Sequence, residues 1–125
     1  MMNTIGRVAV VLLLFAAVAN ASPSNKWRLE FSGNAESDGV IELKISPIGA
    51  EPLTCTVVIR KGTGENKVAK TVVRACRDQL PEDAFHIERD DGEDVLFKKR
   101  RGAANFDIEI VTNTVKDVRI NRDRE

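Results

Sequence analysis

Acidic side chains are concentrated in one short stretch of this sequence, where four of the five residues of Asp90–Asp94 carry a carboxylate. Carboxylates around a glycine, here Gly92, suit a hard cation such as Ca²⁺. The spacing departs from that of the common calcium loop, because two acids are adjacent and the glycine comes third. We expect a hairpin turn with solvated acids, and the sequence leaves open whether Asp90–Asp94 binds a cation.

The densest run of positive charge follows at Lys98, Lys99, Arg100 and Arg101. Such a run is typical of a surface that docks on an acidic partner or on anionic lipid head groups. It is equally typical of a sheet edge or loop that charge keeps soluble, since lysine at an edge discourages strand pairing. Both interpretations stay open, and these four residues are the predicted partner-binding site.

Residues suited to catalysis are scarce. A hydrolase needs a nucleophile, a base and a group that orients the base. The sequence has one histidine, His86, on the charged side of an alternating stretch, whereas metal sites built on histidine use more than one. We therefore predict a protein that is not an enzyme, with no catalytic residue, metal or cofactor.

The balance of charge excludes several kinds of partner. The chain has 125 residues, and the only charged residue among the first 21 is Arg7, so residues 22–125 keep 18 bases against 19 acids. Nucleic acids and anionic membranes attract proteins with an excess of Lys and Arg. We expect no nucleic-acid ligand, and we expect another protein as the partner.

The N-terminal stretch has the pattern of an export signal. Arg7 precedes an uncharged apolar run of twelve residues, Val8 to Ala19, and Ala19-Asn20-Ala21 is a small-residue cleavage site. A run of this length is too short to span a bilayer, which takes about twenty apolar residues. Residues 1–21 are therefore predicted to be a signal peptide. Residues 22–125 are predicted to form one domain without a transmembrane segment, periplasmic or secreted.

Most of the remaining chain alternates between apolar and polar residues, the pattern of half-buried strands. Asp-Gly at 91–92 lies between two alternating runs, which is a strong hairpin signal. Residues 121–125 read as a polar tail. The expected strands cover about 26–32, 41–45, 54–61, 85–89, 95–98, 106–111 and, as a last short strand, 118–120.

One stretch, about Glu65 to Leu80, has helical periodicity, with Thr63 as its expected N-cap and Pro81 after it. Strands with one apolar and one charged face form an antiparallel sheet that is covered on one side. We predict a two-layer α+β domain in the order βββαβββ(β). In it, a curled antiparallel sheet packs one amphipathic helix, about 65–80, on one face.

The two cysteines are expected to meet in that layer. Cys55 lies about six residues before the end of its strand, roughly 20 Å at 3.3 Å per residue. Cys76 lies about eleven residues along the returning helix, roughly 16 Å at 1.5 Å per residue. Both face the apolar side at similar height, so we predict a disulfide between Cys55 and Cys76, which export would favour. The alternative is a pair of buried free thiols.

The stretch from 54 to 112 also resembles a known module. Thr56–Thr63, then Asn66-Lys67-Val68-Ala69 at a helix start, the Asp-Gly hairpin and the strand Phe106–Val111 carry the resemblance. It is similar to the small strand-helix-hairpin unit repeated in bacterial flagellin and hook-associated proteins and in phage tail proteins. The resemblance implies a non-catalytic structural role and the same local order of elements.

Two functions follow as hypotheses. The first is an exported, non-catalytic binding or accessory module of the bacterial envelope or of a secreted assembly. The alternative is an inhibitor-like or immunity-like protein that binds a secreted enzyme, with the loops Gly33–Gly39 and Lys99–Asn105 inserting into a cleft. The sequence gives neither the partner nor the oligomeric state.

The export signal makes a direct prediction about the mature chain. Because Ala19-Asn20-Ala21 is followed at once by Ser22, the exported protein should begin at Ser22. Intact-mass measurement of secreted or periplasmic material should give the mass of residues 22–125. A mass that includes Met1 would contradict the signal peptide.

Overall fold

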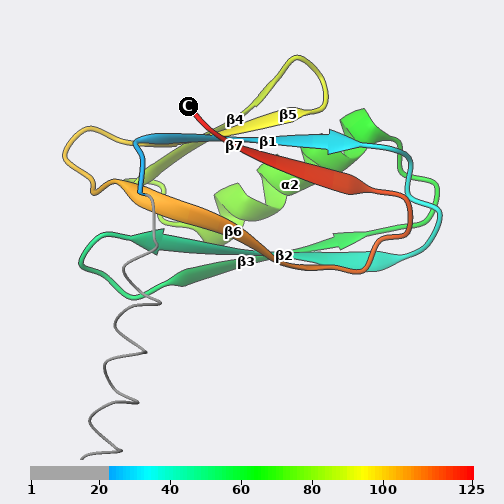
Figure 1. The fold of residues 1–125 in the computed structure, drawn as a ribbon, viewed down its shortest axis with the longest axis horizontal. Helices are drawn as coiled ribbons and strands as arrows, with labels where there is room; N and C mark the ends of the chain where they lie inside the picture. Colours follow the sequence, from blue (N-terminus) through cyan, green and yellow to red (C-terminus); the bar gives the residue numbers. More distant parts are fainter. Residues whose placement is uncertain (1–22) are drawn as a thin grey trace, which may run out of the picture.

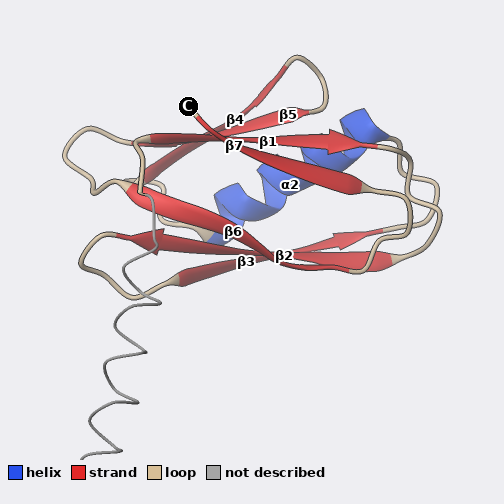
Figure 2. Ribbon diagram, viewed as in Figure 1, coloured by secondary structure: helices blue, strands red, loops and turns tan. Residues whose placement is uncertain are grey.

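The computed structural model describes residues 23–125, so the predicted signal peptide lies outside the described residues. Within that part, seven strands and one helix follow the order βββαββββ (Figures 1 and 2). No helix among the described residues has the length and apolarity needed to cross a membrane. The elements are β1 (Lys26–Ser32), β2 (Gly39–Pro47), β3 (Leu53–Ile59), α2 (Glu65–Gln79), β4 (Phe85–Asp90), β5 (Asp94–Lys99), β6 (Phe106–Asn113) and β7 (Arg119–Arg124).

The strands form two antiparallel sheets, in the orders β4-β5-β1-β7 and β3-β2-β6. The predicted α+β class and element order are confirmed, but one curled sheet is not what forms. A helix of 15 residues is too short to cover seven strands. Instead the apolar faces of the two sheets cover each other, and α2 fills the open side between β3 and β4 (Figure 2).

The alternation seen in the sequence sets which side chains enter this core. Trp27, Leu29 and Phe31 of β1 are buried, and so are Ile41, Leu43 and Ile45 of β2. The helix begins at Glu65 with Gly64 as its N-cap, so Thr63 is not the cap. Its hydroxyl instead donates to the Arg60 carbonyl within the preceding turn, at 2.7 Å. The buried helical residues are Val68, Ala69, Val72, Val73 and Cys76.

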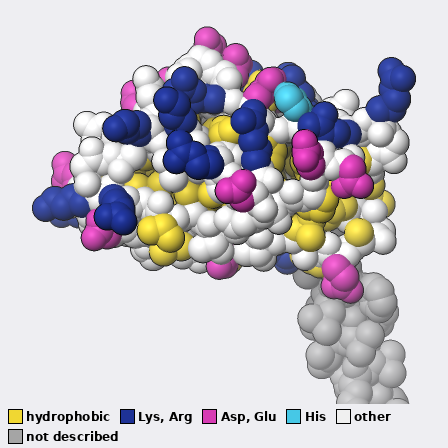
Figure 3. Space-filling model, turned by 180° about the vertical axis from the view of Figure 1, so that it is seen from behind, with side chains coloured by type: hydrophobic (Ala, Val, Ile, Leu, Met, Phe, Trp, Pro, Cys, Tyr) yellow, Lys and Arg dark blue, Asp and Glu magenta, His cyan; other side chains and the backbone are white. Residues whose placement is uncertain are grey.

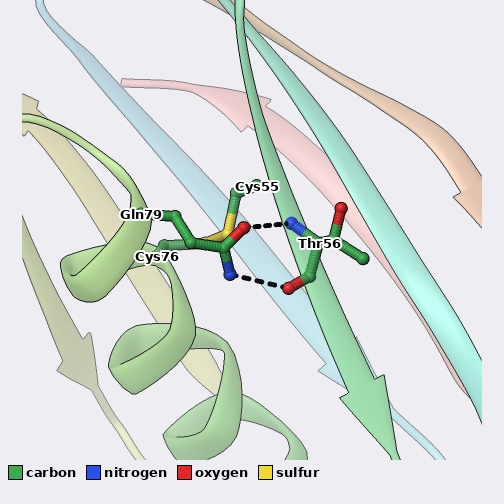
Figure 4. Close-up of a disulfide and its surroundings, with 4 residues drawn as sticks. All are labelled: Cys55, Thr56, Cys76 and Gln79. Atoms are coloured by element: carbon green, nitrogen blue, oxygen red, sulfur yellow. Dashed lines mark hydrogen bonds between the residues drawn. A yellow bond between two sulfur atoms is a disulfide. The ribbon is translucent and has the colours of Figure 1, made fainter.

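Helix α2 is fastened to β3 by a covalent bond and a side-chain amide (Figure 4). The predicted disulfide joins Cys55 to Cys76, with the two Cα atoms 5.6 Å apart and both residues fully buried. One helical turn further, Gln79 accepts from the Thr56 backbone N–H at 2.8 Å and donates to the Thr56 carbonyl at 2.7 Å. The Gln79 side-chain amide thus makes, at the free edge of β3, the pair of hydrogen bonds that a neighbouring strand would make.

The same helix also bonds to the other sheet. Arg77 donates its Nε–H to the carbonyl of Ile87 at 2.8 Å, and β4 is the edge strand of that sheet. Gln79 and Arg77 therefore lie two residues apart and satisfy backbone groups on the facing edges of both sheets. This pair of contacts, together with the disulfide, closes the side of the molecule between β3 and β4.

The opposite side is closed by Trp27 and Arg122. The indole Nε1–H of Trp27 donates to the Phe106 carbonyl at 2.8 Å. Arg122 lies 4.7 Å over the Trp27 ring and donates to the Ile108 carbonyl and, at 3.1 Å, to Asp107. The prediction that residues 121–125 are a tail is wrong, because residues up to Arg124 pair with β1 as strand β7.

We expect reduction of the Cys55–Cys76 disulfide to lower the free energy of unfolding by about 3 kcal/mol. The bridge joins residues 21 apart in sequence, and a loop of that length restricts the unfolded chain by roughly this amount. Urea denaturation followed by Trp27 fluorescence, with and without reductant, measures the difference. The double variant Cys55→Ala/Cys76→Ala should behave like the reduced protein, and equal midpoints in all three cases would contradict the prediction.

Gln79→Ala is expected to destabilise the protein by about 1 kcal/mol, because two hydrogen bonds at the β3 edge are lost at an exposed site. The Thr56 amide should then exchange with solvent deuterium faster. Gln79→Glu keeps an acceptor for the Thr56 N–H but no donor for its carbonyl, so its effect should be intermediate. Unchanged exchange of Thr56 in Gln79→Ala would show that the amide does not protect this edge.

Candidate functional site

The acidic turn predicted between two strands forms as expected, joining β4 to β5 in register with Asp90 opposite Asp94. Its charges are not merely solvated. Arg28 of β1 donates to Asp94 at 2.6 Å and to Asp90 at 3.1 Å, and it also reaches Glu125. The hydrogen bond to Asp94, and then that to Glu125, raise the pKa of Arg28 above its ordinary value. The guanidinium thus lies between the Asp90 and Asp94 carboxylates and donates to both.

The carboxylates that come together at this turn differ from the predicted set. Oxygens of Glu30, Glu93 and Asp94 lie within 4.8 Å of one another, whereas Asp90 faces Arg28. Glu30 belongs to β1, and it approaches because β1 pairs directly with β5. Sequence reasoning missed Glu30 because nothing local records which strand lies beside the hairpin.

Leu96 lies on the outer face of the same sheet and yet is only 4% exposed. It stands between Arg28 and Glu88 in the cross-strand register, and Arg28 reaches past it to Asp90 on β4. The aliphatic stem of such a side chain covers apolar surface while its charged head stays hydrated. Ion pairs therefore cover the outer face of this sheet, which the alternating sequence predicted to be exposed to solvent.

The four residues of the predicted basic run make different contacts at the end of β5. Lys98 is half-buried and bonds to Glu88 at 2.6 Å, and Lys99 donates to the Ala103 carbonyl at 3.2 Å. Arg100 donates its Nε–H to the Glu82 carbonyl at 2.6 Å, and Arg101 is exposed in the following turn. The run lies at the end of the hairpin away from the acidic turn, so it does not neutralise Asp90–Asp94.

Helix α2 adds further cations to this region. Three hollows adjoin one another, and each shares an arginine with the next: Arg77 is common to the first two and Arg100 to the second and third. Figure 3 shows Lys and Arg gathered on this face around the one histidine. We call this surface the basic belt, and its residues are Lys70, Arg74, Arg77, Lys99, Arg100 and Arg101, whereas Lys98 is engaged by Glu88.

The middle hollow is the largest of the three, a cleft of about 410 Å³ between the C-terminal end of α2, β4 and the turn after β5. His86 lines it and bonds through Nε2 to Glu88 at 3.1 Å. Lys98, and after it His86, lower the pKa of Glu88 by hydrogen bonding to its carboxylate. The only histidine is therefore part of a surface ion cluster beside the cleft.

Comparison with family models, with curated proteins and with solved structures found no match. The stretch from 54 to 112 that resembles the flagellin and phage-tail module runs through both sheets, because β3 and β6 pair with β2 whereas β4 and β5 pair with each other. That resemblance stays a prediction. The interpretation of the site depends on its own geometry.

Lys98→Met should raise the pKa of Glu88 toward its ordinary value, because the hydrogen bond from Lys98 is the interaction that lowers this pKa most. A carboxyl group whose pKa is lower in the folded than in the unfolded state stabilises the fold at pH values above its unfolded-state pKa. This stabilisation is lost as the pH falls through the folded-state pKa. NMR titration of the Glu88 carboxyl measures the change. Lys99→Met is the matched control, because Lys99 bonds to a carbonyl instead. Equal pKa values in the two variants would contradict the assignment.

Proposed function

We propose that this chain is an exported, non-catalytic binding domain that docks on an acidic surface of a partner protein through its basic belt. The observation that carries the proposal is the uneven distribution of charge. Residues 23–125 hold nearly equal numbers of bases and acids, yet Lys70, Arg74, Arg77 and Arg100 lie side by side around adjoining hollows. None of these four belongs to an ion pair within the described part of the chain.

Unpaired cations that are close together repel one another, and an acidic partner relieves that repulsion. Charges of this kind steer association and fix its orientation more than they supply affinity. The cations of the outer sheet face differ, because Arg28 and Lys98 are engaged with internal carboxylates. The cations of the belt, by contrast, form no ion pair within the described residues and can meet an acidic partner.

A non-catalytic role is supported by the use of the residues that might otherwise react. Both cysteines are in the disulfide, and the side-chain hydrogen bond of His86 goes to Glu88 and not to a serine, threonine or cysteine that could act as a nucleophile. Export to the periplasm or beyond the cell is supported by the export pattern of the first residues and by that disulfide, which forms in oxidising compartments.

The second candidate function is that of an inhibitor-like protein whose partner is a secreted enzyme. The turn between β5 and β6 favours it, because Arg100, Arg101 and Asn105 are exposed at one end of the belt. The loop Gly33–Gly39, the other loop of this hypothesis, is held more firmly to the domain. Backbone hydrogen bonds tie it down, and Ala35 within it is buried against the core.

The proposal predicts a partner whose capture depends on the belt. The exported, disulfide-bonded chain is used to co-precipitate proteins from envelope and secreted fractions, and the captured protein is identified by mass spectrometry. Lys70→Glu/Arg74→Glu should reduce its capture about tenfold, and added salt should release it. The captured protein should be acidic at the contact.

The matched control is Arg60→Glu/Lys61→Glu, which makes the same change of charge at two exposed residues near the opposite end of the helix. Capture by this control should stay within about twofold of the unchanged protein. Equal loss in both variants, or full capture by Lys70→Glu/Arg74→Glu, would overturn docking through the belt. An enzyme that is inhibited on binding would select the second candidate function.

A further inference from the structure

The cleft in the middle of the basic belt has features of a built binding site. It is bounded by Arg77 of α2, His86 of β4 and Arg100 of the turn after β5. Leu80, Phe85 and Ile87 also line it, and each of the three is at most 5% exposed. Two arginines and three apolar side chains therefore line one cleft at the meeting point of a helix end and an edge strand.

Both arginines are held in place before any ligand arrives. Arg77 donates Nε–H to the Ile87 carbonyl at 2.8 Å, and Arg100 donates Nε–H to the Glu82 carbonyl at 2.6 Å. A guanidinium has five N–H donors, so a bond through Nε leaves the two terminal amino groups. Fixing the side chain beforehand removes part of the entropy cost of binding.

Negative charge is present in the cleft as well, since Asp78 and Glu82 line it. Neither forms an ion pair with Arg77 or Arg100 among the described residues, so the terminal amino groups are not engaged by these carboxylates. The two acids repel a ligand in proportion to its charge. Arg77 and Arg100 attract the ligand in the same proportion, so the preference for a carboxylate comes from the shape of the guanidinium and the apolar lining, and not from charge alone.

We infer that this cleft binds a carboxylate of the partner protein, presented by an acidic residue with an apolar neighbour, with the carboxylate held by Arg77 and Arg100. The fork of a guanidinium matches the two oxygens of a carboxylate. The apolar neighbour would lie where the edges of Leu80, Phe85 and Ile87 reach the lining of the cleft. The inference rests on the proposed function, because it names the chemistry that the belt recognises in its partner.

A defined peptide tests the cleft without knowledge of the partner. The probe is an acetylated, amidated tetrapeptide of alternating leucine and glutamate, titrated into the isotope-labelled exported chain and followed by NMR. Saturable shifts are expected at the backbone amides of Phe85–Ile87 and Arg100. The same peptide with glutamine in place of glutamate should bind at least about tenfold more weakly, since hydrogen bonds to a charged group are lost.

Adjacent arginines provide the matched variants. Arg100→Met should weaken binding of the glutamate peptide about tenfold, whereas Arg101→Met, with the same change of charge but outside the cleft, should change it less than about twofold. Arg100→Lys keeps the charge and removes the fork, so it should also bind several-fold more weakly. Unchanged amide spectra away from the substitution show that each variant is folded.

Several outcomes would overturn the inference. Equal weakening by Arg100→Met and Arg101→Met would mean diffuse attraction to the belt, and equal binding of the glutamine peptide would mean apolar contact alone. Tighter binding of inorganic phosphate than of the peptide would assign the cleft to a phosphate ligand. If the peptide fails to bind while partner capture still depends on Lys70 and Arg74, the cleft inference fails and the proposed function stands.

Discussion

Helix α2 connects two sheets whose facing edge strands, β3 and β4, do not pair with each other. Backbone groups at such an edge need partners, and a sheet edge without them invites pairing with another chain. The C-terminal turn of the helix supplies partners to both edges. The disulfide fixes its distance from β3, and Gln79 completes the ladder at Thr56 (Figure 4). Arg77 bonds to Ile87 on the other side. The remaining architecture depends on this junction.

The junction also positions the candidate site. Arg77 bonds to β4 through Nε and also lines the cleft, and Arg100, bonded through Nε to the Glu82 carbonyl, lines it from the turn after β5. One side chain can meet both needs because a guanidinium carries donors in more than one direction. A binding surface built from residues that already hold the fold together is rigid, which lowers the ordering cost of association.

A net charge near zero conceals a strong division of charge across this surface. Acids of the hairpin turn are engaged by Arg28, and Glu88 is engaged by Lys98, so these charges are used within the domain. Cations of α2 and of the turn after β5 have no such internal partners in the part of the chain that the structure describes. The balanced composition argued against nucleic acids and anionic membranes as ligands, yet the folded chain gathers cations on one face. The difference arises because folding sorts charges by position, which a sum over residues cannot record.

By itself the sequence determined the local elements and one long contact. Alternation marked strands β1 to β6, Asp91-Gly92 marked the hairpin, and the rise per residue of strand and helix brought Cys55 level with Cys76. Each of these follows from neighbours within about twenty residues. The tertiary structure alone decided that the strands form two sheets, that Arg122 turns inward over Trp27, and that Arg77 and Arg100 share a cleft. Trp27 and Phe106, for example, are 79 residues apart. Contacts of that kind depend on which strands pair, and pairing minimises the free energy of the whole chain, so no local pattern encodes it.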